Sequence, residues 1–302
     1  EMVLPRGEQS KSPATIERIY AFLLSERISR DDFILAVGGG VTSDLVGYAA
    51  ATTLRGIAWG VVPTTLLGMV DAAIGGKTGI NHRLGKNLIG AFWHPRFVYV
   101  DTLWVNTLDR RQLTAGIGEI VKYAGLEGEP MVDTLQRYLL NPSQRILTKL
   151  VRQSVACKAK IVTLDEREKN VRMFLNFGHT FGHALEHAAG YGRLLHGEAV
   201  LLGLWAAVRL SVHLKPSRAK RLNAYQHIVE TLLPRIPRVR IDLDRMLTAM
   251  SYDKKRSGRK MRFVLLDRPG KVFIADNVPG RTIRDTVKRT LAVYDRFGGK
   301  DA

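Results

Sequence analysis

Residues 34–44, Ile34-Leu35-Ala36-Val37-Gly38-Gly39-Gly40-Val41-Thr42-Ser43-Asp44, set the architecture of this chain because a short apolar run breaks into three glycines. Residues 34–37 are typical of a buried parallel strand, and residues 45–51 of an Ala-rich helix that follows a glycine turn. Backbone N–H groups at such a turn, at the positive end of a helix, can bind a pyrophosphate. The glycine spacing does not match the GxGxxG fingerprint of dinucleotide-binding folds. A tight turn in which Asp44 caps the helix is therefore an alternative explanation of the same residues.

Two further apolar runs indicate strands, at residues 58–63 and 97–101. Short strands that alternate with helices predict a parallel β-α-β sheet. From about residue 108 the pattern changes to helical periodicity, with a late hairpin expected from residues 262–266 and 271–274. We therefore expect an α/β domain over 1–108 and a mostly α-helical domain over 109–302. The helices are expected over residues 111–126, 142–162, 181–189, 198–214 and 218–233.

The composition narrows the function classes. The chain has 302 residues and a single cysteine, Cys157, which excludes an internal disulfide framework and fits a reducing compartment. No run is apolar enough for a membrane span, and no signal peptide is expected. The net charge of +18 is compatible with nucleic-acid binding or with a basic background that steers anionic substrates. The basic runs lack interleaved aromatic residues, so we favour the second interpretation.

A polar, glycine-rich stretch at residues 75–87 indicates an anion site. Lys77 lies between glycines and Lys86-Asn87 follows Gly85, so flexible ammonium groups can meet a phosphate or carboxylate. A solvated surface loop is the structural alternative. Upstream, Thr64 and Thr65 can hold a ribose or phosphate, or cap a helix, and Asp71 lies within reach of this stretch.

Histidines and one glutamate suggest a metal site. His179 and His183 are spaced i, i+4 on one helix face, His196 follows, and Glu119 stands in an otherwise apolar and glycine-rich helix. One carboxylate with two imidazoles leaves open positions on zinc, as a catalytic site needs. Each residue also has a structural explanation: His183 in the core, His196 as a cap, and Glu119 paired with Lys122. Arg172, Asn176, Lys158 and Glu168 lie nearby in the sequence.

These motifs, in this order, resemble the 3-dehydroquinate synthase family from about residue 7 to about residue 274, most strongly at residues 38–56, 63–95, 115–123 and 172–200. The resemblance implies a Rossmann-like α/β domain followed by a helical domain, in a cytoplasmic homodimer that binds a sugar phosphate. It implies NAD and a divalent metal, usually Zn²⁺ with Co²⁺ as an alternative, and no nucleic acid or membrane. The implied reaction converts the seven-carbon phosphate DAHP to 3-dehydroquinate and phosphate, in the shikimate pathway, with NAD taking and returning one hydride.

The resemblance also assigns roles residue by residue. It implies metal ligation by Glu119, His179 and His196, and proton transfer or site organisation by His183 and Glu168, with Lys77 also catalytic. The substrate residues that it implies are Arg55, Lys77, Lys86, Asn87, Lys122, Lys158, Arg172, Asn176 and Lys254 (or Lys255). The NAD contacts that it implies are Glu8, Lys11, Gly39, Gly40, Asp44, Thr64, Thr65, Asp71, Lys77, Lys86, Trp104 and Thr107.

Family members normally carry a further strand–helix–strand portion ahead of residue 7, and we expect it to be missing here. Three alternatives remain. The first two share the fold: another sugar-phosphate cyclase, and a metal-dependent polyol dehydrogenase such as glycerol dehydrogenase. The retained His183 and Asn176 favour dehydroquinate synthase over the other cyclases, and Glu119 in place of an Asp disfavours the dehydrogenases. The third alternative, of another class, is an inactive basic relative that binds nucleic acid.

Overall fold

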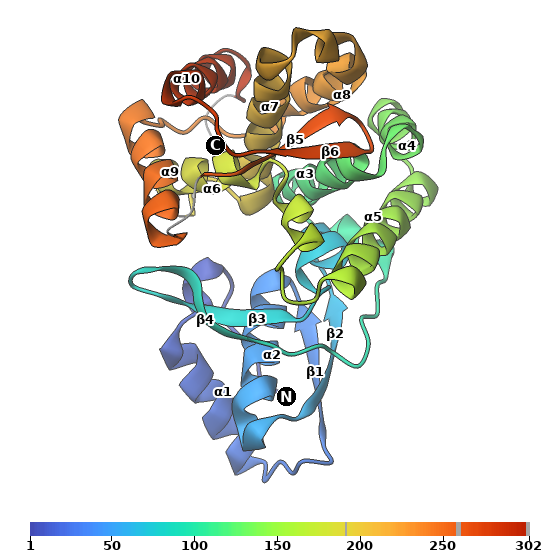
Figure 1. Ribbon diagram of the computed structural model, residues 1–302. Coiled ribbons are helices and arrows are strands. Elements are labelled where there is room, and N and C mark those ends of the chain that lie inside the picture. Colours follow the sequence, from blue (N-terminus) through green and yellow to red (C-terminus); the bar gives the residue numbers. More distant parts are fainter. Residues whose placement is uncertain (191, 258–260, 300–302) are drawn as a thin grey trace.

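The computed structural model describes residues 1–190, 192–257 and 261–299, without the side chains of 252–257. β1 (Phe33–Gly38) and β2 (Ala58–Pro63) pair in parallel along their whole length, joined by α2 (Gly40–Thr52). In Figure 1 these elements form the lower part of the molecule, and the helices from α3 onward form the upper part. The β-α-β unit predicted from residues 34–44 is confirmed, with α2 beginning directly at the glycines. The prediction that this strand is buried is wrong, because β1 pairs only with β2 among the described residues and leaves Leu35 and Val37 52% and 53% exposed.

The predicted third strand is wrong as a full strand. Residues 97–101 run beside β2 but form one isolated parallel bridge, Val61 with Val98. The Val61 N–H donates to the Phe97 carbonyl at 3.2 Å, and the Tyr99 N–H donates to the Val61 carbonyl at 2.9 Å. The pairing ends there because residues 102–107 turn at once into η4 (Thr102–Thr107).

The glycine-rich stretch at residues 75–87 is a hairpin and not the solvated loop considered as an alternative. β3 (Lys77–His82) and β4 (Gly85–Phe92) pair antiparallel, and Gly79 faces Gly90 across them. A Cβ on either glycine would overlap the backbone of the other strand, so the glycines permit a close approach of the two strands. Lys77 and Lys86 are thereby fixed on strands.

The helical part confirms the predicted helices over 111–126, 142–162, 181–189, 198–214 and 218–233. α1, α4, α9 and α10 were not predicted. The late hairpin is confirmed. The elements are α1 (Pro13–Ser25), α3 (Arg110–Glu127), α4 (Glu129–Leu140), α5 (Gln144–Leu164), α6 (His179–Ala189), α7 (His196–Leu214), α8 (Ala219–Leu232), α9 (Leu243–Ser257), β5 (Phe263–Arg268), β6 (Lys271–Ala275) and α10 (Gly280–Phe297). Short helical turns are η1 (Glu8–Ser10), η2 (Thr53–Arg55), η3 (Gly68–Ala72), η5 (Val171–Asn176), η6 (Pro216–Arg218) and η7 (Leu233–Arg235).

One large hydrophobic core holds the helical part together, and two small ones serve the α/β part. The large core collects buried residues from α3 to α10 around α7, and it also takes Leu66, Met69 and Val70 from the α/β part. The small cores lie between α1, α2 and β3, and between α2, β1 and β2. Because the large core crosses from one part to the other, side chains at the junction have fixed neighbours.

Helix α7 corrects the expectation that no segment is long and apolar enough for a membrane. Its residues, His196–Leu214, meet that requirement by length and composition among the residues described, but 78% of its apolar window is buried in the protein. In Figure 1 other helices and the β5–β6 hairpin surround it. It is the central helix of the large core.

Candidate functional site

The site forms where α3 and α7 touch through glycines. A Cβ on Gly118 of α3 would overlap the Gly197 carbonyl of α7, and a Cβ on Gly197 would overlap the Ala115 carbonyl. Such backbone contact is possible only without side chains. Glu119 follows Gly118 and His196 precedes Gly197, so this contact brings the two functional side chains together.

The predicted metal ligands converge, and a third histidine joins them. Glu119 Oε1 lies 3.6 Å from His179 Nε2 and 3.3 Å from His196 Nε2. Ligand atoms of His179, His183 and His196 lie within 4.8 Å of one another. His183 is exposed, so its interpretation as a packed core histidine is wrong. Ligands about 2.1 Å from a tetrahedral zinc lie roughly 3.4 Å apart, which matches the Glu119–histidine distances.

The donor atoms are prepared for a cation. Glu119 is fully buried, and its oxygens accept no hydrogen bond within the described part of the chain, although Lys122 Nζ lies 2.6 Å from Oε2. A buried carboxylate without hydrogen bonds is costly unless a cation compensates it. The His179 Nδ1–H donates to the Phe177 carbonyl at 3.1 Å, which leaves Nε2 for a metal. Burial lowers the pKa of His179 to about 3, so this imidazole is neutral, as a ligand must be.

His196 is oriented by a residue that the sequence analysis missed. Its Nδ1–H donates to Glu186 Oε2 at 3.1 Å, and Lys86 Nζ donates to Glu186 Oε1 at 3.0 Å. Burial opposes protonation of His196, but the carboxylates of Glu119 and Glu186 outweigh it and raise the pKa of His196 to about 10, so a metal at Nε2 would have to displace a proton. The signal for Glu186 was present: 179, 183 and 186 are spaced i, i+4, i+7 on α6, one helix face.

Asp71 and two buried lysines stand beside this cluster. Asp71 Oδ1 lies 3.1 Å from Lys122 Nζ and 3.0 Å from Lys158 Nζ, and it also accepts the Tyr123 hydroxyl. Lys122 therefore lies between Asp71 and Glu119. The structural pairing of Glu119 with Lys122 is confirmed, and it is compatible with the metal interpretation. Burial opposes ionisation of Asp71, but Lys122 and Lys158 outweigh it and hold the pKa of this carboxyl well below its usual value.

A second group forms around Glu168, whose backbone is left-handed (φ 56°). Its carboxylate pairs with Lys77 of β3 and accepts the Asn176 side-chain amide at 3.0 Å. Burial opposes ionisation of Glu168, but the hydrogen bond and charge of Lys77 outweigh it and lower its pKa, so the group is an anion at neutral pH.

Arg172 is not an open anion receptor. It is 2% exposed, and its guanidinium donates to the backbone carbonyls of Gly75 (2.9 Å) and Glu166. Asp165 accepts the N–H groups of residues 169, 170 and 172 and shapes this turn. Arg172 thus fastens the turn before β3 to the helical part.

Apart from Asp71, Lys77 and Lys86, whose contacts are described above, the residues assigned to NAD fall into two places. Lys11 is buried and donates to Asp44 Oδ2 at 2.6 Å and to Asn87, while Glu8 Oε1 accepts from Asn81 Nδ2 at 2.8 Å. Asn87, expected at the substrate, lies with this group. Asp44 is not a helix cap, because Gly39 is the N-cap of α2. Burial raises the pKa of Asp44 against the charge of Lys11.

The second place is the carboxyl edge of β1 and β2, where Gly39, Gly40, Thr64 and Thr65 follow the strands. Thr65 Oγ1 accepts the Gly68 N–H at 3.1 Å, so the capping interpretation holds for it. His196 does not cap α7; its N-cap is Leu195. Trp104 and Thr107 lie on η4, and the Thr107 hydroxyl donates to the Trp104 carbonyl.

One predicted residue is not brought to the site, and another cannot be placed. Arg55 is exposed in η2, ahead of the amino end of β2, whereas the other residues gather beyond the carboxyl ends of the strands. The side chains of Lys254 and Lys255 lie outside the described residues.

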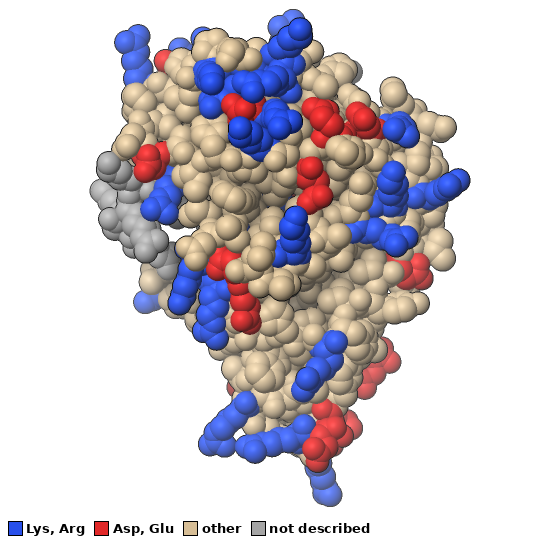
Figure 2. Space-filling model, turned by 45° about the vertical axis from the view of Figure 1, so that its right-hand side comes forward, with Lys and Arg blue, Asp and Glu red and all other residues tan. Residues whose placement is uncertain are grey.

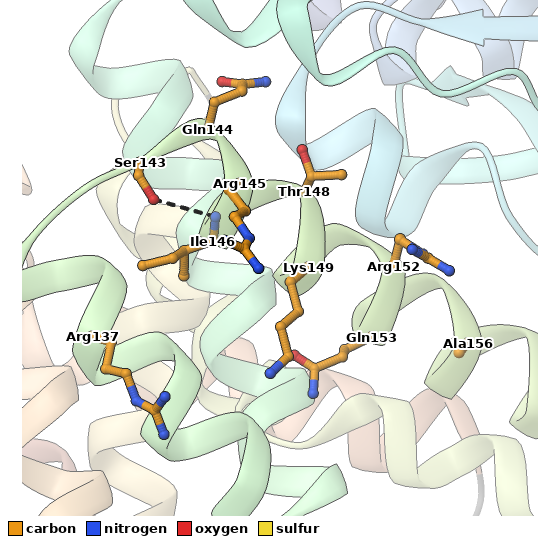
Figure 3. A pocket seen from close by; sticks show the side chains of 10 residues that line it. All are labelled: Arg137, Ser143, Gln144, Arg145, Ile146, Thr148, Lys149, Arg152, Gln153 and Ala156. Atoms are coloured by element: carbon orange, nitrogen blue, oxygen red, sulfur yellow. Dashed lines mark hydrogen bonds between the residues drawn. The ribbon is translucent and has the colours of Figure 1, made fainter.

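A separate basic cavity of about 1110 Å³ lies between α4 and α5. Figure 3 shows Arg145, Lys149 and Arg152 along α5 and Arg137 on α4, and none of the predicted site residues lines it. On the face in Figure 2, basic side chains are scattered among acidic ones without a continuous stripe.

Comparisons with known proteins define the class. A structure of 2-epi-5-epi-valiolone synthase from Streptomyces hygroscopicus with NAD⁺ and Zn²⁺ matches with a TM-score of 0.87 and 27% identity, over 97% of this chain and 82% of that one. A structure of 2-deoxy-scyllo-inosose synthase with carbaglucose-6-phosphate, NAD⁺ and Co²⁺ matches with a TM-score of 0.85 and 28% identity, over 94% and 81%. The fold is therefore that of the sugar-phosphate cyclases.

The family follows from the sequence comparisons. Residues 1–115 match the family model described as 3-dehydroquinate synthase N-terminal, and residues 116–256 the one described as 3-dehydroquinate synthase C-terminal. The 3-dehydroquinate synthase of Nitrosomonas europaea is 42% identical over 96% of this chain and 80% of that protein. That of Gloeobacter violaceus is 44% identical over 94% and 79%. The chain belongs to the 3-dehydroquinate synthase family.

Proposed function

We propose that this chain is a 3-dehydroquinate synthase that converts DAHP to 3-dehydroquinate and inorganic phosphate in the shikimate pathway. The observation that carries the proposal is the convergence of Glu119, His179 and His196 next to two buried lysines. Such an arrangement fits an anionic, oxygen-rich substrate held at a cation. Identity of 41–44% to 3-dehydroquinate synthases, against 27–28% to the other cyclases, supports this reaction over theirs.

Glu119, His179 and His196 hold a divalent metal in this proposal, with Zn²⁺ the first choice and Co²⁺ the second. The buried Glu119 oxygens, which accept no hydrogen bond from the described residues, and the neutral His179 support it. When bound, the metal polarises the substrate hydroxyls and makes their protons easier to lose. Lys122 keeps Glu119 ionised, and His183, which is exposed beside the ligands, is placed to exchange protons with a substrate.

NAD lies at the carboxyl edge of β1 and β2 in this proposal, with Gly39 and Gly40 at its pyrophosphate. Both cyclase structures described above contain NAD⁺. When bound there, the cofactor would supply a reversible hydride acceptor. Lys11, held by Asp44 and Asn87, and Glu8 form the outer side of this site, with Trp104 and Thr107 on η4.

The substrate phosphate meets ammonium groups from both parts of the molecule in this proposal. Lys77 is 52% and Lys86 27% exposed, so both can exchange their carboxylate partners for a phosphate. Lys158 and Lys122 are buried and hold the polar end of the substrate through charge. Glu168, ionised and beside Asn176, accepts a proton, and Arg172 holds the turn that carries it.

The domain limits of 1–108 and 109–302 and a cytoplasmic homodimer belong to the same proposal. Arg55 gives a reason for the dimer. It is exposed in η2, ahead of the amino end of β2, while the other site residues lie beyond the carboxyl ends of the strands, so in this proposal it serves the site of a second copy. Nucleic acid and membrane have no role in this proposal.

Phosphate release from DAHP tests the function. With NAD and Zn²⁺ we expect release without net NADH, loss of release with a chelator, and recovery when zinc is restored. His179→Ala should abolish release and lower the zinc content of the protein. Net NADH formation would indicate a polyol dehydrogenase. Release that persists after complete metal removal would contradict the metal assignment, and tight salt-sensitive nucleic-acid binding that ignores NAD would favour the inactive relative.

A further inference from the structure

The carboxylate of Glu186 joins three elements. It projects from α6, is buried, and uses its two oxygens for different partners. Oε2 accepts the His196 Nδ1–H of α7 at 3.1 Å, and Oε1 accepts from Lys86 Nζ of β4 at 3.0 Å. A single buried side chain therefore connects the hairpin of the α/β part to an imidazole of the metal cluster.

This connection matters because of what His196 does with its other nitrogen. With Nδ1–H engaged, Nε2 faces Glu119 Oε1 at 3.3 Å. A carboxylate on the far nitrogen fixes the tautomer and ring direction of a ligating histidine and increases its basicity. His179 is fixed by a backbone carbonyl instead, so of these two imidazoles His196 is the one whose orientation depends on a side chain.

Lys86 extends the dependence to the other part of the molecule. Its ammonium pairs with the Glu186 oxygen that His196 does not use, and both side chains are at most 27% exposed. In such surroundings the ion pair is less screened than at the surface. If Lys86 moves or binds another anion, the Glu186 carboxylate loses a neighbouring positive charge and becomes free to change its orientation.

We propose that Glu186 is a positioning residue that aims His196 at the cation, and that through Lys86 it couples the β3–β4 hairpin to cation affinity. The inference rests on the proposed function, since it assumes that the cluster binds a divalent cation. Coupling between two sites is reciprocal in binding free energy. An anion that pairs with Lys86 in place of Glu186 should therefore change the affinity of the cluster for the metal. By the same coupling, the bound metal should change the affinity for the anion.

The test measures Zn²⁺ binding to the metal-free full chain by competition with a chromophoric chelator, without substrate or NAD. Glu186→Ala should weaken binding about 10- to 100-fold, as loss of such a partner does. Glu186→Gln should recover most of that loss, because the amide oxygen still accepts the Nδ1–H. In Co²⁺-loaded protein, the visible ligand-field spectrum should shift in Glu186→Ala and stay close to wild type in Glu186→Gln.

Glu230→Ala is the matched control. Glu230 is a partly buried helical glutamate that also accepts two side-chain hydrogen bonds, from Trp205 and Gln226, but outside the cluster. The zinc affinity and the cobalt spectrum of the Glu230→Ala protein should equal those of wild type. Lys86→Met should weaken zinc binding less than Glu186→Ala, and it should add nothing to Glu186→Gln, in which the ion pair is already lost.

The outcomes distinguish failure of the positioning role, failure of the coupling and failure of the proposed metal site. Wild-type zinc affinity in Glu186→Ala, or a Glu186→Gln variant as weak as Glu186→Ala, overturns the positioning role. Lys86→Met with unchanged affinity overturns the coupling. A wild-type chain that binds no divalent cation overturns the proposed metal site itself, and this inference with it. If Glu186→Ala does not fold, Glu186→Leu takes its place, since leucine nearly keeps the volume but cannot accept the Nδ1–H, and the same loss of zinc affinity is expected.

Discussion

At the scale of single residues, Asp71 has the most consequences. It lies on the π-helical turn η3, and one of its oxygens faces Lys122 and Tyr123 of α3 and Lys158 of α5. The Lys158 ammonium also donates to the Asp71 backbone carbonyl at 2.5 Å. Two buried ammonium groups near one metal cluster would repel each other and the metal without this carboxylate. We therefore regard Asp71 as the residue that makes the lysines tolerable, beyond the NAD contact expected for it.

Asp71→Asn should destabilise the protein by about 3 kcal/mol at pH 7, because it leaves two buried cations with one carboxylate fewer. The pKa of Asp71 is depressed in the folded state, so its contribution is present above the unfolded pKa of about 3.9 and is lost as pH falls below it. Urea unfolding at pH 7 and at pH values from 5 down to 3 measures this. The difference in the free energy of unfolding between wild type and Asp71→Asn should become smaller as the pH falls. A difference that stays constant with pH would contradict the assignment.

At the scale of elements, the contact between α3 and α7 sets the site. Gly118 precedes Glu119 and lies against the Gly197 carbonyl, and Gly197 follows His196 at the start of α7. Glycine costs helix stability, about 1 kcal/mol relative to alanine, so its use here is explained by the close approach of the backbones. The distance between the two helices therefore sets the distance between two proposed metal ligands, Glu119 and His196.

Gly197→Ala should therefore act on the metal as well as on the fold. The new methyl group overlaps the Ala115 carbonyl, and forced separation of packed helices costs about 1–3 kcal/mol. We expect a lower melting temperature and zinc binding at least tenfold weaker. Gly280→Ala is the control, since a Cβ there meets nothing within 4 Å at the start of α10. Unimpaired zinc affinity in Gly197→Ala would show that the helix separation does not control the ligands.

At the scale of the whole molecule, the α/β part and the helical part are fastened by charged side chains. Lys77 pairs with Glu168, Lys86 with Glu186, and the Arg172 guanidinium with the Gly75 carbonyl. The proposed substrate is itself an anion that meets several of these cations. A net charge of +18 adds a long-range attraction, since a basic protein raises the encounter rate of anionic ligands.

Salt should reveal that attraction. An increase from about 0.1 M to about 1 M KCl shortens the screening length from about 10 Å to about 3 Å. We expect kcat/KM for DAHP to fall several-fold, with kcat changed by less than about twofold, because buried ion pairs are screened little. Steady-state phosphate release measures both constants, with sucrose of equal osmolality as control. A kcat/KM that does not respond to salt would remove the steering role of the charge.

The sequence by itself determined the β-α-β unit, most helices of the second part, the late hairpin, and the kinds of side chain that do the chemistry. These are local properties: periodicities of 2 and 3.6, glycine turns, and short motifs such as His179 to His183. Residues 97–101 show the limit of such local patterns. An apolar run does not reveal whether a neighbouring strand runs beside it for long enough to form a full strand.

Only the tertiary structure decided which charges meet. Lys86 and Glu186 are 100 residues apart and Lys77 and Glu168 are 91 apart, so no local pattern encodes either pair. The same holds for Asp71 with Lys122, for Arg172 with the Gly75 carbonyl, and for the glycine contact that brings Glu119 to His196. The physical reason is that pairing energies act through space over a few ångströms, and packing of the shared core selects the neighbours.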